Sequence, residues 1–210
     1  MNAPLRGGPG AHGALAVAPV TLRGDVVVLE PLGLEHVPAL ARVGLDPELW
    51  RYTPTAVASE FDMRTYVETA LEERRLGVSM PFVVLDVASG AAIGSTRYAA
   101  IAPEHRRLEI GWTWYAPAYQ RTAANTEAKS LLLTHAFETL GARRVEFKTD
   151  ALNARSRAAL LRIGATEEGT FRKHMVVASG RIRDTVYFSI LDDEWPAIRS
   201  RLRERLTRSA

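Results

Sequence analysis

The feature that most constrains this chain is a strand-like segment that leads through a loop of small and polar residues into a helical run. The strand-like segment spans residues 108–115, the loop begins at Tyr119, and the helical run spans 126–140. The first N–H groups of a helix have no partner within the helix and can point at a phosphate. Small side chains let such an anion approach the backbone, so this junction predicts an anion-binding site between a strand and a helix.

Length and composition narrow the class of protein. The 210 residues fit one domain, and the chain contains no cysteine. Disulfides, thiolate metal sites and a cysteinyl acyl-enzyme are therefore excluded, which is compatible with a cytoplasmic location. The histidines show no metal-binding spacing, and no apolar run approaches the roughly 20 residues of a membrane span. A net charge of +3 is explained by a solvated arginine-rich surface, so we expect neither a nucleic-acid nor a membrane partner.

Periodicity and turn residues predict a mixed α/β domain over residues 21–210, preceded by a disordered arm over 1–20 that is rich in Gly, Ala and Pro. Asp62 is the candidate N-cap of the second long helix. The expected elements, in order, are a strand at 26–32, helices at 34–43, 47–52 and 62–76, strands at 82–87, 91–101 and 107–115, a helix at 126–140, a strand at 145–148, a helix at 153–163, strands at 165–177 and 183–191, and a helix at 194–206.

Several motifs in this order resemble the GNAT superfamily of N-acetyltransferases, and within it the branch named for ribosomal-protein N-terminal acetyltransferases. The motifs are Asn125-Thr-Glu-Ala-Lys129, Lys148-Thr-Asp150, Asn153-Ala-Arg-Ser156, Ile163-Gly-Ala165, Glu168-Gly169 and the segment 184–195. The resemblance implies a central, mostly antiparallel sheet of about six or seven strands flanked by helices. A splayed pair of parallel strands in that sheet would form the coenzyme A slot of a single acyl-CoA N-acyltransferase domain, in a monomer or homodimer.

The resemblance also implies which residues hold acetyl-CoA. Two positions depart from the family's loop, because Ala123 and Asn125 replace its glycines. Alanine is tolerated there if its φ is negative, and asparagine can adopt unusual backbone angles and cap a helix. The implied cofactor-binding residues are Gly111, Trp112, Thr113 and Trp114 of the strand, Gln120, Arg121, Thr122, Ala123, Ala124, Asn125 and Thr126 of the loop, and Asn153 and Ser156 of the next helix.

Two residues are implied as catalytic. Glu109 occupies the position of a carboxylate that handles the proton of the acceptor amine, with an ion-paired strand residue as the alternative reading. Ser156 is the candidate to protonate the departing CoA thiolate, because the position of the family's tyrosine holds Leu160. The alternative for Ser156 is a serine on the surface of the first helical turn. Strand glycines often mark bulges, and Gly111 predicts one beside Glu109.

The acceptor side is less defined by sequence. Trp50 and Tyr52 are candidates for substrate binding, with packing of a short helix as the alternative. His174 is a further candidate, because histidine is the residue type best suited to exchange protons at physiological pH, although a lone histidine in a strand is more often structural. A carboxylate that some members of the branch use as a base is replaced by Met175.

The resulting hypothesis is an N-acetyltransferase that moves an acetyl group from acetyl-CoA to a primary amine, either a peptide N-terminus or a small amine. Without a cysteine, direct attack in a ternary complex is favoured over a covalent acyl-enzyme. Three alternatives stay open: another acyl donor such as succinyl-CoA, an acyl-CoA-binding protein without turnover, and a nucleic-acid-binding module that uses the basic C-terminal residues.

Overall fold

The computed structural model describes residues 14–208. Residues 1–13 of the predicted arm lie outside the described residues. The rest of that arm contacts the domain: the Leu15 side chain is only 3% exposed, and its N–H donates to the carbonyl of Pro103 at 3.4 Å. Val17 and Val20 pack against the same core. The packed domain therefore begins several residues before the boundary expected at residue 21.

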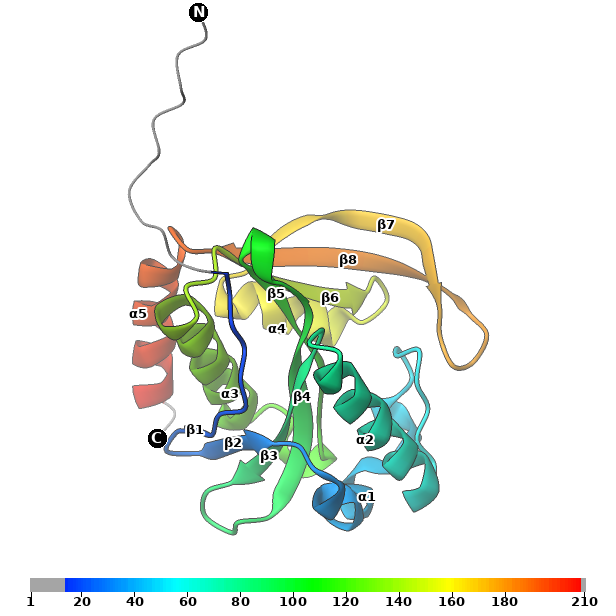
Figure 1. The fold of residues 1–210 in the computed structure, drawn as a ribbon. Coiled ribbons are helices and arrows are strands. Elements are labelled where there is room, and N and C mark those ends of the chain that lie inside the picture. Colours follow the sequence, from blue (N-terminus) through cyan, green and yellow to red (C-terminus); the bar gives the residue numbers. More distant parts are fainter. Residues whose placement is uncertain (1–13, 209–210) are drawn as a thin grey trace, which may run out of the picture.

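The chain forms one eight-stranded sheet with the order β1-β2-β3-β4-β5-β6-β8-β7 (Figure 1). Every neighbouring pair is antiparallel except β5 and β6, which are parallel. The mixed fold class is confirmed, and the additional strand is the two-residue β1. The strands are β1 (Leu22–Arg23), β2 (Val27–Pro31), β3 (Met80–Asp86), β4 (Ala92–Ala102), β5 (Arg107–Tyr115), β6 (Arg144–Asp150), β7 (Thr166–Val176) and β8 (Ile182–Leu191).

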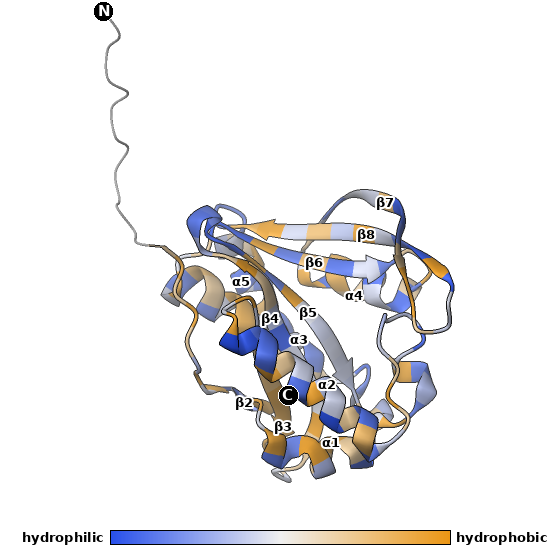
Figure 2. Cartoon of the chain, turned by 45° about the vertical axis from the view of Figure 1, so that its right-hand side comes forward, coloured by the Kyte–Doolittle hydropathy of each residue, from blue (hydrophilic) through white to orange (hydrophobic). Residues whose placement is uncertain are grey.

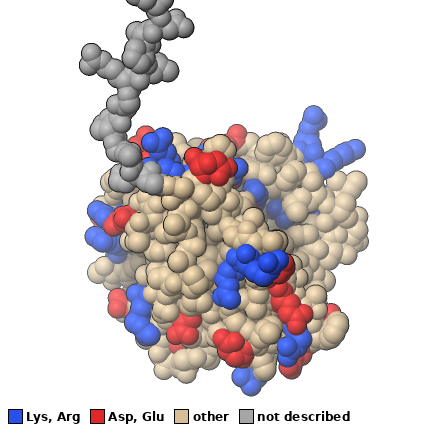
Figure 3. All heavy atoms as spheres, in the orientation of Figure 1, with Lys and Arg blue, Asp and Glu red and all other residues tan. Residues whose placement is uncertain are grey.

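Helices cover both faces of this sheet. The helices are α1 (Val37–Gly44), α2 (Glu60–Arg75), α3 (Ala123–Thr134), α4 (Ala154–Ile163) and α5 (Trp195–Thr207). Figure 1 shows α1 and α2 together on one side and α3 with α5 on the other. Among the described residues, no helix is long and apolar enough to cross a membrane. Charges of both signs are interspersed over the face drawn in Figure 3.

Two helix starts differ from the sequence-based expectation. The N-cap of α2 is Ser59, whose hydroxyl accepts from the Asp62 N–H at 3.1 Å, so Asp62 lies inside the first turn. Helix α3 begins at Ala123, because the Thr122 hydroxyl caps it by accepting from the Ala124 N–H at 3.3 Å. Asn125 therefore lies within the helix and does not cap it. Alanine is the strongest helix former, which favours the earlier start.

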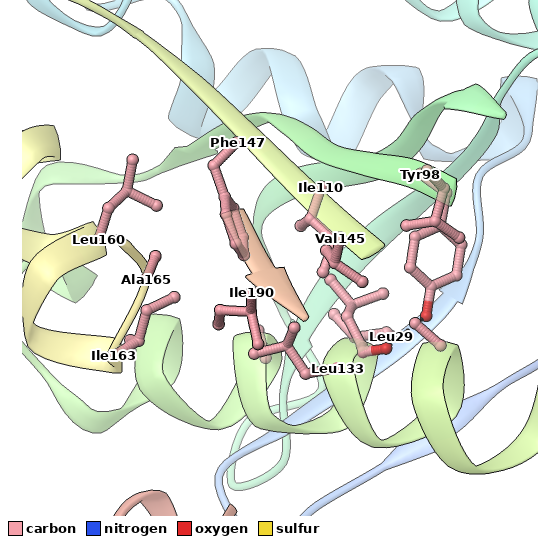
Figure 4. Close-up of a cluster of buried hydrophobic side chains, with 14 of the residues drawn as sticks. Leu29, Tyr98, Ile110, Leu133, Val145, Phe147, Leu160, Ile163, Ala165 and Ile190 are labelled. Atoms are coloured by element: carbon pink, nitrogen blue, oxygen red, sulfur yellow. Dashed lines mark hydrogen bonds between the residues drawn. The ribbon is translucent and has the colours of Figure 1, made fainter. Parts of the chain in front are cut away.

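Two hydrophobic cores hold the helices to the sheet. The larger core lies under α3, α4 and α5 and includes Phe147, Leu133, Leu160 and Ile190, which are shown in Figure 4. The second core lies under α1 and α2. Figure 2 shows apolar residues, orange, on the strands and on the helices, interspersed with polar ones. Burial of these side chains stabilises the sheet by roughly 25 cal/mol per Å² of apolar surface.

A buried carboxylate fastens the first strands to α3. Glu127 is 6% exposed, and its carboxylate accepts from the backbone N–H groups of Asp25, Val26 and Val27 at 3.0, 2.7 and 2.7 Å. Gly24 is required beside it, since a Cβ there would lie 2.4 Å from the Glu127 Cδ. The three N–H groups precede or begin β2, so this one side chain fixes where β2 starts relative to the helix.

We expect Glu127→Gln to lower the free energy of unfolding by about 2–3 kcal/mol, because charge-assisted hydrogen bonds are lost and an amide N–H₂ faces backbone donors. Urea denaturation of the purified variant measures this. Glu68→Gln, an exposed substitution on α2, is the matched control and should stay within about 0.5 kcal/mol of the wild type. Equal unfolding midpoints for the two variants would contradict the role of Glu127.

Candidate active site

The candidate site begins where β5 and β6 separate. The two strands pair through three residues, Arg107–Glu109 on β5 and Arg144–Glu146 on β6. Beyond Glu109 no further pair joins them, and Figure 2 shows the ribbons running apart. Backbone groups of a central strand are thereby left without a neighbouring strand. Such groups require hydrogen-bond partners, so the fork between β5 and β6 is suited to a ligand with an amide-bearing chain.

A bulge in β5 accompanies this separation. Ser95 of β4 pairs with Trp114, whereas Arg97 pairs with Gly111, so β5 carries one extra residue between these pairs. Trp112 takes up the distortion with a φ of +53°. The bulge therefore lies one residue after the position expected at Gly111. Both Trp112 and Trp114 pack against the core beneath α1 and α2.

Gly111 has a different requirement. A Cβ at this position would lie 2.5 Å from Oε1 of Glu109, because the Glu109 carboxylate lies over the Gly111 backbone. Glu109 is 9% exposed, and its Oε2 pairs with Nζ of Lys148 on β6 at 2.8 Å. Burial lowers the pKa of Lys148, but attraction to Glu109 outweighs that effect and raises it overall. The Glu109–Lys148 pair thus bridges the two strands at the point where they part.

The loop before α3 approaches the same end of β5. Gln120 donates to the carbonyl of Tyr115 at 3.1 Å and accepts from Arg155 of α4 at 2.6 Å. Arg121 is exposed and has a φ of +65°, so the unusual backbone angle lies there and not at Asn125. Thr122 then caps α3. Gln120, in the loop before α3, therefore joins the end of β5 to the start of α4.

The first turn of α3 contains four residues that differ in solvent exposure: Ala123, Ala124, Asn125 and Thr126. Ala124 and Thr126 are buried, while Ala123 and Asn125 are partly exposed. The small Ala123 side chain and the N–H groups of the first turn are the parts available to an anion.

Helix α4 begins with a side-chain cap. The side chain of Asn153 accepts from the Ser156 N–H at 3.0 Å and is the N-cap of the helix. Ser156 is half-buried in the first turn, and Leu160 lies one turn later in the larger core. Because Leu160 is buried in this core, the position where other members of the family carry a tyrosine supplies no hydroxyl group here.

The three residues predicted to bind the acceptor lie in different surroundings. Trp50 is 5% exposed, its indole N–H donates to Gly44, and its ring packs on Trp114, so it belongs to the core and not to an open substrate wall. Tyr52 is half-buried, and its carbonyl accepts from Arg183 of β8 at 3.2 Å. His174 is exposed on β7.

His174 is nevertheless connected to the fork. Its ring lies 5.9 Å from that of Tyr187, and the Lys148 ammonium lies 5.1 Å from the Tyr187 ring on β8. Because Lys148 also pairs with Glu109, a continuous set of contacts runs from the fork to the exposed β7–β8 hairpin. Lys148 and Tyr187 were missed as site residues, since they come from strands whose order in the sheet is not visible in sequence.

Comparison with known proteins identifies the fold and the family. Residues 27–166 match the family model described as the acetyltransferase (GNAT) domain.

The chain belongs to the GNAT acetyltransferase family.

Similar proteins support the branch. A GCN5-related N-acetyltransferase from Brucella melitensis is 33% identical, with a TM-score of 0.84 over 90% of this chain and 86% of its own. RimJ from Mycobacterium smegmatis, solved with CoA-disulfide, is 25% identical, with a TM-score of 0.76 over 89% of this chain and 93% of its own. YdaF from Bacillus subtilis (strain 168), named provisionally as a ribosomal N-acetyltransferase, is 40% identical over 43% of this chain. That match spans 49% of YdaF, about half of its length.

This GNAT domain also contains a buried lysine, Lys129, which the sequence motif 125–129 includes but which was not predicted as a site residue. Lys129 of α3 is 5% exposed, and its Nζ donates to the Thr113 hydroxyl of β5 at 2.8 Å. Thr113 in turn lies 2.8 Å from the hydroxyl of Thr96 on β4. Burial lowers the pKa of Lys129 to about 7, with Glu109 opposing part of that effect. The signal in the sequence was a lysine two residues before the apolar run 131–133 of the helix.

The lowered pKa of Lys129 predicts that the stability of this GNAT domain depends on pH. Folded Lys129 loses its proton near pH 7, whereas an unfolded lysine keeps it to about pH 10.4. Between these values the unfolded chain binds more protons, so the free energy of unfolding rises with pH, by about 2–3 kcal/mol from pH 7 to 9.5. Burial raises the pKa of Tyr98 and Tyr115, so unfolded tyrosines ionise first near pH 10 and set the upper limit of this window.

Urea denaturation at intervals of pH measures the slope. Lys129→Met should abolish this contribution and be more stable than the wild type at pH 7. Lys173→Met, at an exposed lysine of β7, should keep the wild-type slope. An unchanged slope in Lys129→Met would show that Lys129 stays protonated throughout.

Proposed function

We propose that this GNAT domain transfers an acetyl group from acetyl-CoA to a primary amine by direct attack in a ternary complex. The observation that carries the proposal is the fork between β5 and β6, with the bulge at Trp112 and the start of α3 at its mouth. The fork offers unpaired backbone to an extended chain, and the N–H groups of α3 face an anion. These features fit the pantetheine arm and the pyrophosphate of coenzyme A, respectively.

Bound acetyl-CoA would supply the thioester that carries the acyl group. Backbone groups of Gly111, Trp112, Thr113 and Trp114 are proposed to hold the arm along β5. Asn153 and Ser156 would border it from α4, with the Ser156 hydroxyl placed to give a proton to the departing sulfur. Support for this arrangement comes from Gln120, which precedes α3 and joins the end of β5 to the start of α4.

Glu109 is proposed to handle the proton of the acceptor amine. Its carboxylate lies over Gly111 beside the bulge, and its pairing with Lys148 holds it in this orientation. An ammonium partner weakens a carboxylate as a base, so transfer through a water molecule suits this site better than direct abstraction. An α-amine, with a reference pKa near 7.7–8.0, needs little assistance of this kind.

The substrates are tested by incubating the protein with mixed acyl-CoAs and a panel of peptides and small amines, followed by mass spectrometry of the products. The proposal expects acetylated amine and free CoA. A succinylated product would show that succinyl-CoA, and not acetyl-CoA, is the donor. Binding of CoA without any acylated product would favour an acyl-CoA-binding protein without turnover.

The anion site at α3 is tested by Ala123→Asp. An aspartate in the first turn favours the helix but repels a phosphate, so stability should be kept while CoA affinity falls about tenfold or more. Isothermal titration calorimetry measures the affinity, and Ser200→Asp, an exposed change on α5, is the control for added charge. Unchanged affinity in a folded Ala123→Asp protein would place the pyrophosphate elsewhere.

The role of Glu109 is tested by Glu109→Gln. Turnover at pH 7 should fall by about 10²–10⁴-fold, with partial recovery at high pH as more amine becomes neutral. Glu146→Gln is the matched control, because Glu146 is the register partner of Glu109, is 8% exposed and is also ion-paired. If both variants lose activity to the same extent with the wild-type pH profile, Glu109 is only an ion-paired strand residue.

A further inference from the structure

A cavity of about 230 Å³ lies between the N-terminal half of α2 and the bulge of β5. Tyr66 of α2 and Trp112 of the bulge line it, together with Arg97 of β4. Phe61, which is 76% exposed, also contributes to the lining. Because Trp112 belongs to both the bulge and the cavity, a molecule whose amine reaches the fork can extend into this space.

Arg97 gives the cavity its polar character. The residue is 1% exposed, and its Cζ lies 4.9 Å from the ring centre of Tyr66 and 4.5 Å from that of Trp112. One terminal nitrogen donates to Glu73 at 2.9 Å. Its Nε is buried and has no hydrogen-bond partner within residues 14–208. A buried donor without an acceptor is unfavourable, so a ligand oxygen that reaches Nε gains a hydrogen bond the free protein lacks.

The charges around Arg97 decide what kind of oxygen fits. Glu73 already neutralises the guanidinium, and Asp62 adds a carboxylate to the cavity lining. A carboxylate ligand would lose its hydration and meet two carboxylates beside a single cation, so it gains little from the site. An uncharged carbonyl oxygen is far less costly to dehydrate and still accepts a hydrogen bond. The aromatic lining favours an apolar group next to that carbonyl.

We propose that this cavity binds an uncharged carbonyl group and an adjoining apolar group of the molecule that bears the acceptor amine. The inference rests on the proposed function for the placement of the amine. Amides and peptides would then be preferred over free amino acids and over simple amines. The Nε atom of Arg97 is buried in the free protein, so a neighbouring ring has to move before a ligand oxygen can reach it. Trp112 is less buried than Tyr66, and we therefore expect Trp112 to turn aside when the oxygen binds.

Three acceptors that share one amine and one phenyl ring test the proposal: phenylalaninamide, phenylalanine and phenethylamine. With acetyl-CoA, kcat/KM for the amide, expressed per neutral amine because the three amines differ in pKa, should exceed that for each of the others by about 10- to 100-fold. Ala56→Trp fills the cavity from its exposed loop and should remove the preference. Ala58→Trp, two residues away and outside the lining, should retain it. Arg97→Lys keeps a charge beside Glu73 without an Nε–H, and should lose the preference over phenethylamine.

Binding is measured separately by calorimetry with the N-acetylated forms of the three compounds, so the test does not depend on turnover. Tighter binding of the amide without acetylation of any amine would sink the proposed function and leave the cavity site standing. Equal binding and equal kcat/KM of the amide and phenethylamine, or a preference for phenylalanine, would overturn the cavity site. So would an amide preference that survives Ala56→Trp.

Discussion

The separation of β5 from β6 after Glu109 is the constraint on which the rest of the candidate site depends. A parallel pair in the middle of a sheet normally hydrogen-bonds along its whole length. Here the extra residue at Trp112 bends β5 away, and the Glu109–Lys148 ion pair spans the strands where pairing stops. The helix α3 begins beside the far end of β5. Backbone donors from a strand and from a helix therefore converge on one opening.

The domain contains several buried charges, and it compensates each of them differently. Glu127 accepts from backbone N–H groups, Glu109 pairs with a lysine, and Arg97 pairs with Glu73 against aromatic rings. Lys129 has the weakest compensation, since its ammonium group donates to the Thr113 hydroxyl and otherwise lies 5.7 Å from the ring of Phe147. Burial disfavours a charged group unless a partner of opposite charge stabilises it. The pKa of Lys129 therefore falls, whereas that of Lys148, which pairs with Glu109, does not.

The proposed cofactor side of the fork and the proposed acceptor side are attached to the rest of the domain in different ways. On the cofactor side, Gln120 and the caps of α3 and α4 fix short polar segments to the large core. On the acceptor side, the β7–β8 hairpin extends beyond the helices (Figure 1), and Phe171, Val176 and Ile182 are more than half exposed. The hairpin is held to the loop near Tyr52 by Arg183 and by the N–H of Ala178.

The sequence by itself determined the elements and the family. Strand β5 was predicted with its observed bounds, because the alternation of residues along a strand is a local property. It did not determine the start of α3, where three small residues were read as loop, or the role of Trp50, whose burial depends on α2 and β5 packing over it. The contacts of Lys129 with Thr113 and of Lys148 with Glu109 were decided only by the tertiary structure. They join different elements across the fork, and local periodicity carries no information on which strands and helices become neighbours.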